Sequence, residues 1–366
     1  MSSTISTLVN ILCNLIGVGF LAIPYFFSLI GFRQGMLLLL IAGSSQCLAA
    51  IILSHSLADP LSSSSFSEIA IKLKCHRLKC VMEACLVIQM VANLVISTIV
   101  IADASPILSR TYSAIFGLTV AAILSLSADL HHFRFSSFVS LAAAIAILIA
   151  VACADVIDSS VHDTTWSFVN ASQAWGCCLF AFSFAINVPR LTMEISRSER
   201  KRLSIILIIA VAAATIFYAA FAAAALRVTS HPHANFILGF TGNSSNLLRA
   251  LLVFSTIAKM PLSSHPAREI LKIYFPVKSA TLTISIYFAA FLIFQISGNL
   301  ASGVSVVGAC GSLAASFLFP CLLLRIRAAL EPLLAEPLDA AQVHAMDAMT
   351  IFAISTALPG VYYSLS

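Results

Sequence analysis

Charged side chains are scarce in this chain of 366 residues. Asp, Glu, Lys and Arg together make up 10% of it, whereas hydrophobic residues make up 60%. A soluble globular domain carries about 25% charged residues, which it needs to cover its surface with groups that water solvates. The shortage of charge therefore excludes an ordinary water-soluble enzyme and indicates a polytopic protein that membrane lipid surrounds.

Carboxylates are almost absent from the long apolar stretches, which contain only Glu83 and Asp155. An enzyme that works inside the membrane needs paired carboxylates, a Ser/His pair or several histidines at the same depth. Glu83 and Asp155 are predicted near opposite faces of a hydrocarbon core about 30 Å thick, so they cannot act together. The sequence thus predicts that the protein is not an enzyme, and it implies no cofactor.

Cysteine is missing from the loops that are predicted to face outward, although the chain has ten cysteines. Most of them lie in apolar stretches, where Cys behaves as a small hydrophobic residue. We therefore expect no structural disulfide. Cys75, His76 and Cys80 are close in sequence, but no second ligand pair completes a four-ligand metal site. We expect no metal centre.

Apolar stretches long enough to cross a bilayer fill most of the chain. A helix rises about 1.5 Å per residue, so roughly 17 to 25 apolar residues span the hydrocarbon core. The loops between the stretches are too short for a separate soluble domain. We predict one transmembrane domain over residues 1–366 with eleven helices at 5–29, 35–57, 81–102, 111–128, 137–156, 171–189, 203–226, 246–264, 279–297, 300–324 and 348–364.

The basic residues indicate the orientation, because cytoplasmic loops retain Lys and Arg. With the N-terminus inside, 15 of the 20 basic residues fall in cytoplasmic loops. Arg33, Arg110, Arg227 and Arg249 fall outside, and Lys259 lies within a span. We predict a cytoplasmic N-terminus and an outer or luminal C-terminus, in the plasma membrane or a vacuolar or lysosomal-type membrane. The basic loops explain the net charge of +5 without a nucleic-acid partner.

Glycine and proline interrupt the first predicted helix. Gly17 and Gly19 lie near its middle and Pro24 follows, and such residues loosen the backbone hydrogen-bond ladder. Freed N–H and C=O groups survive in a bilayer only where protein or a water-filled cavity surrounds them. The sequence therefore predicts a ligand site here, although the two glycines could instead serve close helix packing.

The sixth predicted helix carries matching signs of an interruption, with Ser183, Asn187 and Pro189 inside an apolar stretch. It stands five helices after the first. Interrupted helices at corresponding positions of two halves point to a transporter built from inverted repeats, in which the half-helix ends face the substrate and the coupling ion. We therefore expect both interruptions to border one site.

Four sequence motifs resemble those of a known family. They are Asn10-x-x-x-Asn14-x-x-Gly17-x-Gly19-x-Leu21-x-x-Pro24-Tyr25 in the first helix, Phe180-Ala-Phe in the sixth, Pro261-Leu-Ser-Ser-His-Pro266-Ala-Arg268 at the end of the eighth and Val307-Gly308-Ala-Cys-Gly311 in the tenth. Together they resemble the amino acid/auxin permease family, which includes sodium-coupled neutral and vacuolar amino acid transporters. The resemblance covers nearly the full chain.

The resemblance implies an all-α polytopic membrane protein with the leucine-transporter fold: five plus five helices in inverted repeat, with an eleventh helix appended. It also implies secondary transport of neutral amino acids by alternating access, with the substrate between the first and sixth helices. The residues that it implies are Gly17, Val18 and Gly19 for the substrate carboxylate, with Asn14 and Phe20 in the same motif, and Phe182, Ser183 and Phe184 for the α-ammonium.

A polar stripe runs along the third predicted helix, where Gln89, Asn93 and Ser97 recur every four residues and so share one face. The family places this helix beside the substrate, which makes Asn93 and Ser97 candidate substrate contacts. Hydrogen bonding between helices is the alternative explanation. The chain departs from the family pattern at Ser97, where an aromatic residue is usual, and at Asn187, near a histidine that many members have.

Lys259 is the only basic residue predicted well inside a span, where an unpaired charge is costly. Sodium-coupled relatives tend to carry a sodium-ligating hydroxyl at this position. An ammonium and a sodium ion would compete for the carbonyls near Ile16 and Gly17, and Ser255 is a further candidate on the same helix. Ser255 and Thr256 could line the same cavity, or their hydroxyls could bond to the preceding helical turn. We predict that Lys259 replaces sodium, so that transport uses H⁺ or exchange. The alternative is that its side chain extends to the membrane surface.

A non-transporting amino acid sensor of the same fold is the alternative function. The chain offers a signalling partner little to bind, since four residues precede the first predicted helix and two follow the last. We therefore expect a transporter.

Overall fold

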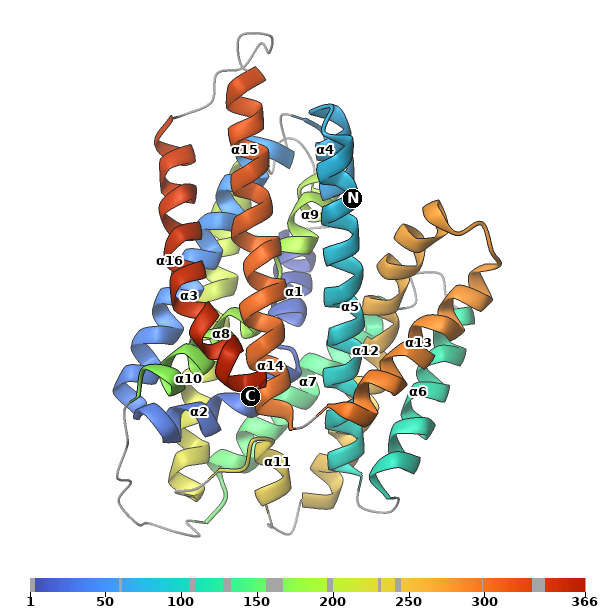
Figure 1. The fold of residues 1–366 in the computed structure, drawn as a ribbon. Coiled ribbons are helices and arrows are strands. Elements are labelled where there is room, and N and C mark those ends of the chain that lie inside the picture. Colours follow the sequence, from blue (N-terminus) through green and yellow to red (C-terminus); the bar gives the residue numbers. More distant parts are fainter. Residues whose placement is uncertain are drawn as a thin grey trace.

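The computed structural model describes residues 4–58, 61–105, 109–127, 133–155, 167–195, 200–229, 232–240, 245–297, 299–330 and 340–365. Within these ranges the regular structure is entirely helical, and the helices form one bundle (Figure 1). The long helices are α3 (Phe32–Leu53), α5 (His76–Ala104), α6 (Arg110–Ser127), α7 (Phe133–Ala152), α10 (Leu203–Val228), α12 (Ser245–Tyr274), α13 (Ser279–Ile296) and α16 (Ala340–Leu365).

Two short helices mark the opposite ends of the bundle. Helix α4 (Phe66–Lys72) lies at one end and α11 (Phe236–Gly239) at the other (Figure 1). Ser65 caps α4, because its hydroxyl accepts a hydrogen bond from the backbone N–H of Glu68. Serine is common at this position before the first turn of a helix. We call these two ends of the bundle the α4 end and the α11 end.

Both predicted interruptions are present. The first separates α1 (Thr4–Leu15) from the 3₁₀ turn η1 (Val18–Ala22), which leads into α2 (Ile23–Ile30). The second separates α8 (Phe168–Ala181) from the short turn η4 (Ala185–Asn187), which leads into α9 (Val188–Glu194). The helix that follows each interruption has a proline in its first turn, Pro24 in α2 and Pro189 in α9. The N–H that proline lacks has no intrahelical partner at this position, so no hydrogen bond is lost. Helix α2 lies towards the α11 end and α9 towards the α4 end (Figure 1).

A third helix is bulged instead of broken. Helix α14 (Leu300–Val307) continues through the π-helical turns η6 (Gly308–Ser312) and η7 (Ala314–Leu318) into α15 (Phe319–Leu330). Turns of this kind widen a helix locally while its hydrogen-bonded path continues. The stretch therefore still crosses the bundle as one unit.

Within the described residues, eight helical stretches are long and apolar enough to cross a membrane: Thr7–Ile30, Phe32–Ala58, His76–Ala104, Phe168–Met193, Leu203–Val228, Ser245–Tyr274, Ser279–Ile296 and Leu300–Leu330. Two shorter apolar helices, Arg110–Leu126 and Phe138–Ala152, fall at the fourth and fifth predicted spans. The expected ends of those spans, at Ala128 and Val156, lie outside the described residues. The protein is thus a polytopic helical membrane protein, while the count of eleven spans stays a prediction.

Some helices extend beyond the predicted apolar spans. Helix α12 continues ten residues past Ser264 to Tyr274, through Pro266, and α5 begins at His76 instead of Val81. The difference has a simple cause: loss of hydropathy marks where a helix leaves the lipid, not where its hydrogen bonds end. Sequence hydropathy therefore located these helices but underestimated their length.

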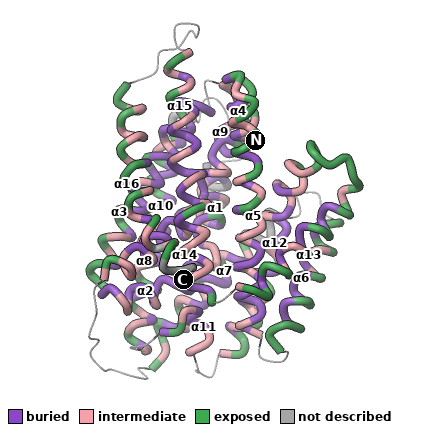
Figure 2. Tube along the Cα trace, viewed as in Figure 1, coloured by how far each residue is buried: buried purple, intermediate pink, exposed green. Residues whose placement is uncertain are grey.

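The interior of the bundle contains the interrupted helices, whereas α6 and α13 present many exposed residues (Figure 2). The exposed faces of α6 and α13 carry large hydrophobic side chains, among them Ile115, Phe116, Ile284 and Phe288. A contiguous apolar surface of this kind fits contact with lipid. The two interruptions thus lie in the interior of the bundle, away from these apolar surfaces, where freed backbone groups can find polar partners.

Glycine contacts hold α8 close to α14 and η6. A Cβ atom on Gly308 would collide with the carbonyl oxygen of Gly176, and one on Gly176 would collide with that of Ser305. The same Cβ on Gly308 would lie 2.9 Å from the backbone nitrogen of Phe180. Small residues allow this close approach of helix backbones in membranes. The contact positions the last turn of α8, directly before the second interruption.

We expect Gly308→Ala to destabilise the protein, because the added methyl group forces two backbones apart. Overpacking of this kind costs about 1–3 kcal/mol. Gly303→Ala is the matched control on α14, since its Cβ would lie 3.8 Å from Ile96, an ordinary contact. Thermal unfolding in detergent should show a lower melting temperature for Gly308→Ala alone. Equal melting temperatures for both variants and the wild type would contradict the close contact.

Candidate functional site

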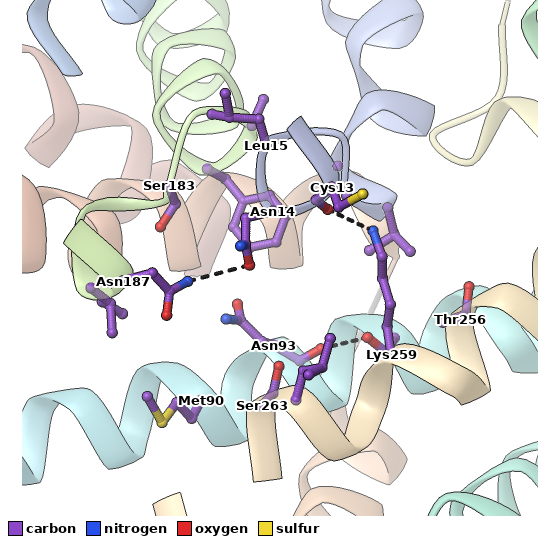
Figure 3. Close-up of a pocket in the computed structure, with 18 of the residues that line it drawn as sticks. Cys13, Asn14, Leu15, Met90, Asn93, Ser183, Asn187, Thr256, Lys259 and Ser263 are labelled. Atoms are coloured by element: carbon purple, nitrogen blue, oxygen red, sulfur yellow. Dashed lines mark hydrogen bonds between the residues drawn. The ribbon is translucent and has the colours of Figure 1, made fainter. Parts of the chain in front are cut away.

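A cavity of about 180 Å³ lies where the two interruptions meet (Figure 3). Four parts of the chain form its wall: the first interruption, α5, the second interruption and α12. Of the residues that the sequence predicted for substrate or ion contact, eight line the cavity, namely Asn14, Gly17, Val18, Gly19, Asn93, Ser97, Ser183 and Lys259. The other lining residues are Cys13, Leu15, Met90, Phe180, Ala181, Ile186, Asn187, Thr256, Leu262, Ser263 and Pro266.

The first interruption frees backbone carbonyls at the end of α1, because the last turn of a helix has no following N–H groups. The Lys259 ammonium donates to two of them, at 2.9 Å from the oxygen of Cys13 and 3.1 Å from that of Ile16. Figure 3 shows the lysine side chain reaching from α12 to this point. The Lys259 ammonium thus lies at the carbonyls of Cys13 and Ile16, one of which belongs to the predicted pair near Ile16 and Gly17.

Gly17 and Gly19 have different surroundings. A Cβ on Gly17 would meet nothing nearer than the Leu15 carbonyl oxygen, at 3.9 Å, so this position faces open space in the cavity. A Cβ on Gly19 would lie 2.7 Å from the ring of Phe180. Gly17 thus exposes backbone to the cavity, whereas Gly19 lets the first interruption pack against the end of α8. Close packing accounts for Gly19, while a ligand contact at Gly17 stays a prediction.

The second interruption presents Ser183 to the cavity. The Ser183 hydroxyl accepts a hydrogen bond of 3.1 Å from Gln89 Nε2 on α5. The carbonyl oxygen of Phe182 accepts from the backbone N–H of Phe184, and that of Phe184 accepts from the N–H of Asn187. Both phenylalanine rings are buried away from the cavity. Of the three residues expected to receive the α-ammonium, Ser183 alone lines the cavity.

Three side-chain amides face one another in the cavity (Figure 3). Asn187 Nδ2 donates to Asn14 Oδ1 at 3.3 Å and so bridges the two interruptions. Asn14 Nδ2 donates in turn to the Asn10 carbonyl oxygen at 2.8 Å. The third amide belongs to Asn93 on α5, and its Oδ1 is buried without a hydrogen-bond partner among the described residues. A buried acceptor of this kind is costly until a donor reaches it.

Hydroxyl groups add further polar atoms to the wall. Ser97 donates to the Asn93 backbone carbonyl at 2.9 Å, which is the usual bond of a serine to the preceding helical turn. Thr256 Oγ1 is buried and has no hydrogen-bond partner among the described residues. Asn93 and Thr256 are therefore the two lining residues whose polar atoms are ready for a ligand or water.

Charge in the cavity comes from one residue. Among the described residues that line it, Lys259 is the only one with a charged side chain. Its ammonium is already bound to two carbonyl oxygens. The described lining therefore offers no carboxylate that could pair with a cationic group of a ligand.

Three predicted residues lie on the other side of the first interruption. Phe20, Ile16 and Ser255 border a separate space of about 10 Å³. The Phe20 ring packs edge-on against Phe217 and Phe221. Ile16 reaches the main site only through its carbonyl oxygen, which Lys259 binds.

Ser255 and its neighbour Thr256 face different sides of α12. The Ser255 hydroxyl donates to the Leu252 carbonyl oxygen at 2.9 Å and lies outside the main cavity, whereas Thr256 lines it. Adjacent residues on a helix point about 100° apart, so one of the two had to face away. The sequence indicated the pair but not which member faces the cavity.

Sequence reasoning gave Tyr218 on α10 no role. Its hydroxyl approaches backbone carbonyls at both interruptions. A tyrosine in a long apolar helix has no distinctive spacing, so no sequence signal pointed to it. The sequence marked Asn187 as a sign of the second interruption and as a departure from the family pattern, but it did not predict that the Asn187 amide bridges the two interruptions.

Comparison with known proteins adds a family match. A family model described as transmembrane amino acid transporter protein matches residues 1–328. This range contains both interruptions, the cavity and Lys259. No curated protein matches the chain.

We expect Gly17→Leu to abolish the uptake of labelled amino acids, because the leucine side chain would project into the cavity without displacing protein atoms. Gly17→Ala is the matched control and should retain most of the activity, since its Cβ has free space. Uptake into proteoliposomes, with the amount of reconstituted protein measured for each variant, tests this. If Gly17→Leu transports as the wild type does, the substrate does not bind at the first interruption.

Proposed function

Because the chain belongs to the transmembrane amino acid transporter family, we propose that it is a secondary active transporter of neutral amino acids that works by alternating access without sodium. The family is one of transporters and not of enzymes. The observation that carries the proposal is the Lys259 ammonium on the carbonyls of Cys13 and Ile16, at the edge of a cavity between two interrupted helices.

The cavity supports a zwitterionic substrate. The backbone N–H groups of Val18 and Gly19 stand at the start of a helical segment, where N–H groups lack partners and negative charge is favoured. They are suited to the substrate carboxylate. The Ser183 hydroxyl and the unpartnered Asn93 Oδ1 are acceptors for the α-ammonium. The lack of a carboxylate among the described lining residues favours substrates with an uncharged side chain.

Lys259 supports independence from sodium. In transporters with interrupted helices, freed carbonyls and half-helix ends coordinate the coupling cation. Here an ammonium that belongs to the chain takes two such carbonyls, at 2.9 and 3.1 Å. A sodium ion at this point would have to displace it. Proton coupling or amino acid exchange is therefore the proposed source of driving force.

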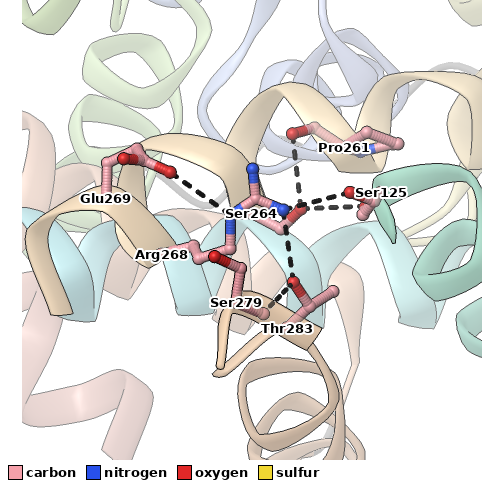
Figure 4. A network of polar contacts seen from close by, with 7 residues as sticks. All are labelled: Ser125, Pro261, Ser264, Arg268, Glu269, Ser279 and Thr283. Atoms are coloured by element: carbon pink, nitrogen blue, oxygen red, sulfur yellow. Dashed lines mark hydrogen bonds and ion pairs between the residues drawn. The ribbon is translucent and has the colours of Figure 1, made fainter. Parts of the chain in front are cut away.

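Alternating access requires two groups of helices that move relative to each other. We assign α1, α3, α8 and α10 to one group and α5, α6, α12 and α13 to the other. A polar network supports the second group as one body (Figure 4). Ser125 on α6 lies 3.1 Å from Ser264 on α12, and Arg268 donates to the Ser125 carbonyl and to Thr283 on α13, at 3.1 and 3.4 Å.

The arrangement of the interrupted helices supports an inverted repeat. The half that follows the first interruption, α2, lies towards the α11 end, and the half that follows the second, α9, lies towards the α4 end (Figure 1). Two halves of opposite direction place both interruptions at the middle of the bundle. This is the geometry that a five-plus-five repeat with an appended α16 would produce.

Uptake should persist when sodium is replaced by choline, because the chain supplies its own cation. Proteoliposomes loaded and diluted in either salt, tested with a panel of labelled L-amino acids at two pH values, measure this. Dependence on pH would indicate proton coupling, and dependence on internal amino acid would indicate exchange. Uptake that collapses in choline would overturn sodium independence. Saturable binding without any counterflow would indicate a sensor instead of a transporter.

Replacing Lys259 by Ala should lower uptake about ten- to hundredfold, because the Cys13 and Ile16 carbonyls lose a charged donor inside the bundle. Lys272→Ala is the matched control: the same substitution on the same helix, at an exposed position near its end. It should transport normally. Normal uptake by Lys259→Ala, at equal protein in the vesicles, would show that the lysine has no part in the cycle.

A further inference from the structure

Tyr218 lies between the two interrupted helices. Its hydroxyl oxygen is 2.5 Å from the carbonyl oxygen of Leu15, the last residue of α1, and 2.9 Å from that of Ala181, the last residue of α8. The side chain comes from α10 and is completely buried. One hydroxyl group therefore contacts the freed ends of both helices.

A phenolic hydroxyl has a single proton to donate. Two carbonyl oxygens share it here. The Leu15 oxygen has a second donor, the backbone N–H of Gly17 at 2.7 Å. The Tyr218 hydroxyl therefore links the end of α8 to the end of α1 through a single side-chain group.

The aromatic ring of Tyr218 is held by its neighbours. It packs edge-on against Phe182 at 5.4 Å and against Phe217 at 5.9 Å between ring centroids. Phe182 directly follows Ala181 in the chain, so the Tyr218 ring and the Tyr218 hydroxyl contact adjacent residues at the second interruption. A phenylalanine at position 218 would retain these ring contacts and remove the hydrogen bonds alone.

The first interruption is held from two sides. Tyr218 on α10 binds the Leu15 carbonyl, and Lys259 on α12 binds those of Cys13 and Ile16. The helix α10 belongs to the group that contains α1 and α8, whereas α12 belongs to the opposite group.

We propose that Tyr218 is a positioning residue that fixes the two interruptions to each other, so that they form one substrate site and move as one body. Lys259 at the first interruption and Gln89 at the second then link that body to the opposite group. This inference rests on the proposed function, because it assigns Tyr218 a role in alternating access.

Hydrogen exchange followed by mass spectrometry tests the inference without requiring transport. In Tyr218→Phe, amides of residues 16–22 and of residues 182–187 should both exchange about tenfold faster, since each interruption loses a hydrogen bond that restrains it. Tyr287→Phe is the matched control. It removes another buried hydroxyl, bonded to Ser125 at 2.8 Å and Ser264 at 3.2 Å, and should leave both interruptions unchanged.

A kinetic measurement accompanies the exchange experiment. With the panel amino acid that the wild-type protein accumulates fastest, Tyr218→Phe should raise KM about tenfold and change the maximal rate less, because the two halves of the site are no longer held in place. Exchange that rises at one interruption only, at neither, or equally throughout the protein would overturn the inference. If amides at both interruptions exchange faster in Tyr218→Phe, but neither the wild type nor any variant transports an amino acid, the proposed function fails. The role of Tyr218 as a positioning residue between the interruptions then still stands.

Discussion

Freed backbone carbonyls inside a bilayer are the constraint on which this structure depends. An interrupted helix leaves C=O groups without partners, and each unsatisfied group costs several kcal/mol in a medium without water. Side chains from neighbouring helices bind these groups here: Lys259 from one side and Tyr218 from the other. The close packing at Gly308 follows from the same constraint, because α8 must end where those donors can reach it.

The Lys259 ammonium and the freed carbonyls stabilise each other. A cation at membrane depth is costly unless it is paired or bound to backbone oxygens, and a freed carbonyl is costly unless it has a donor. Hydrogen bonds from a charged donor are also shorter and stronger than neutral ones. The arrangement is therefore stable only if both features are present, which explains why the one basic residue well inside a predicted span lies at a helix interruption.

The site residues that the sequence could predict are those that are unusual in an apolar transmembrane helix. Gly17 and Gly19 stand out in an apolar helix, and Lys259 stands out as a charge in a span. Residues that are common in such helices were not predictable. Tyr218 fits any apolar helix, and the choice between Ser255 and Thr256 depends on helix rotation, which packing decides. The ends of α5 and α12 were also missed, since polar residues continue a helix beyond the lipid.

An ammonium fixed to the chain constrains the energetics of the proposed cycle. A sodium ion drives uptake because it binds on one side of the membrane and leaves on the other, which couples substrate movement to its gradient. Lys259 cannot leave. It can hold and release the first interruption as the two helix groups move, but it carries no ion across unless its own proton is exchanged. In the proposed cycle the net driving force comes from a proton or from a second amino acid, and the proposed role of Tyr218 would make either one act on both interruptions at once.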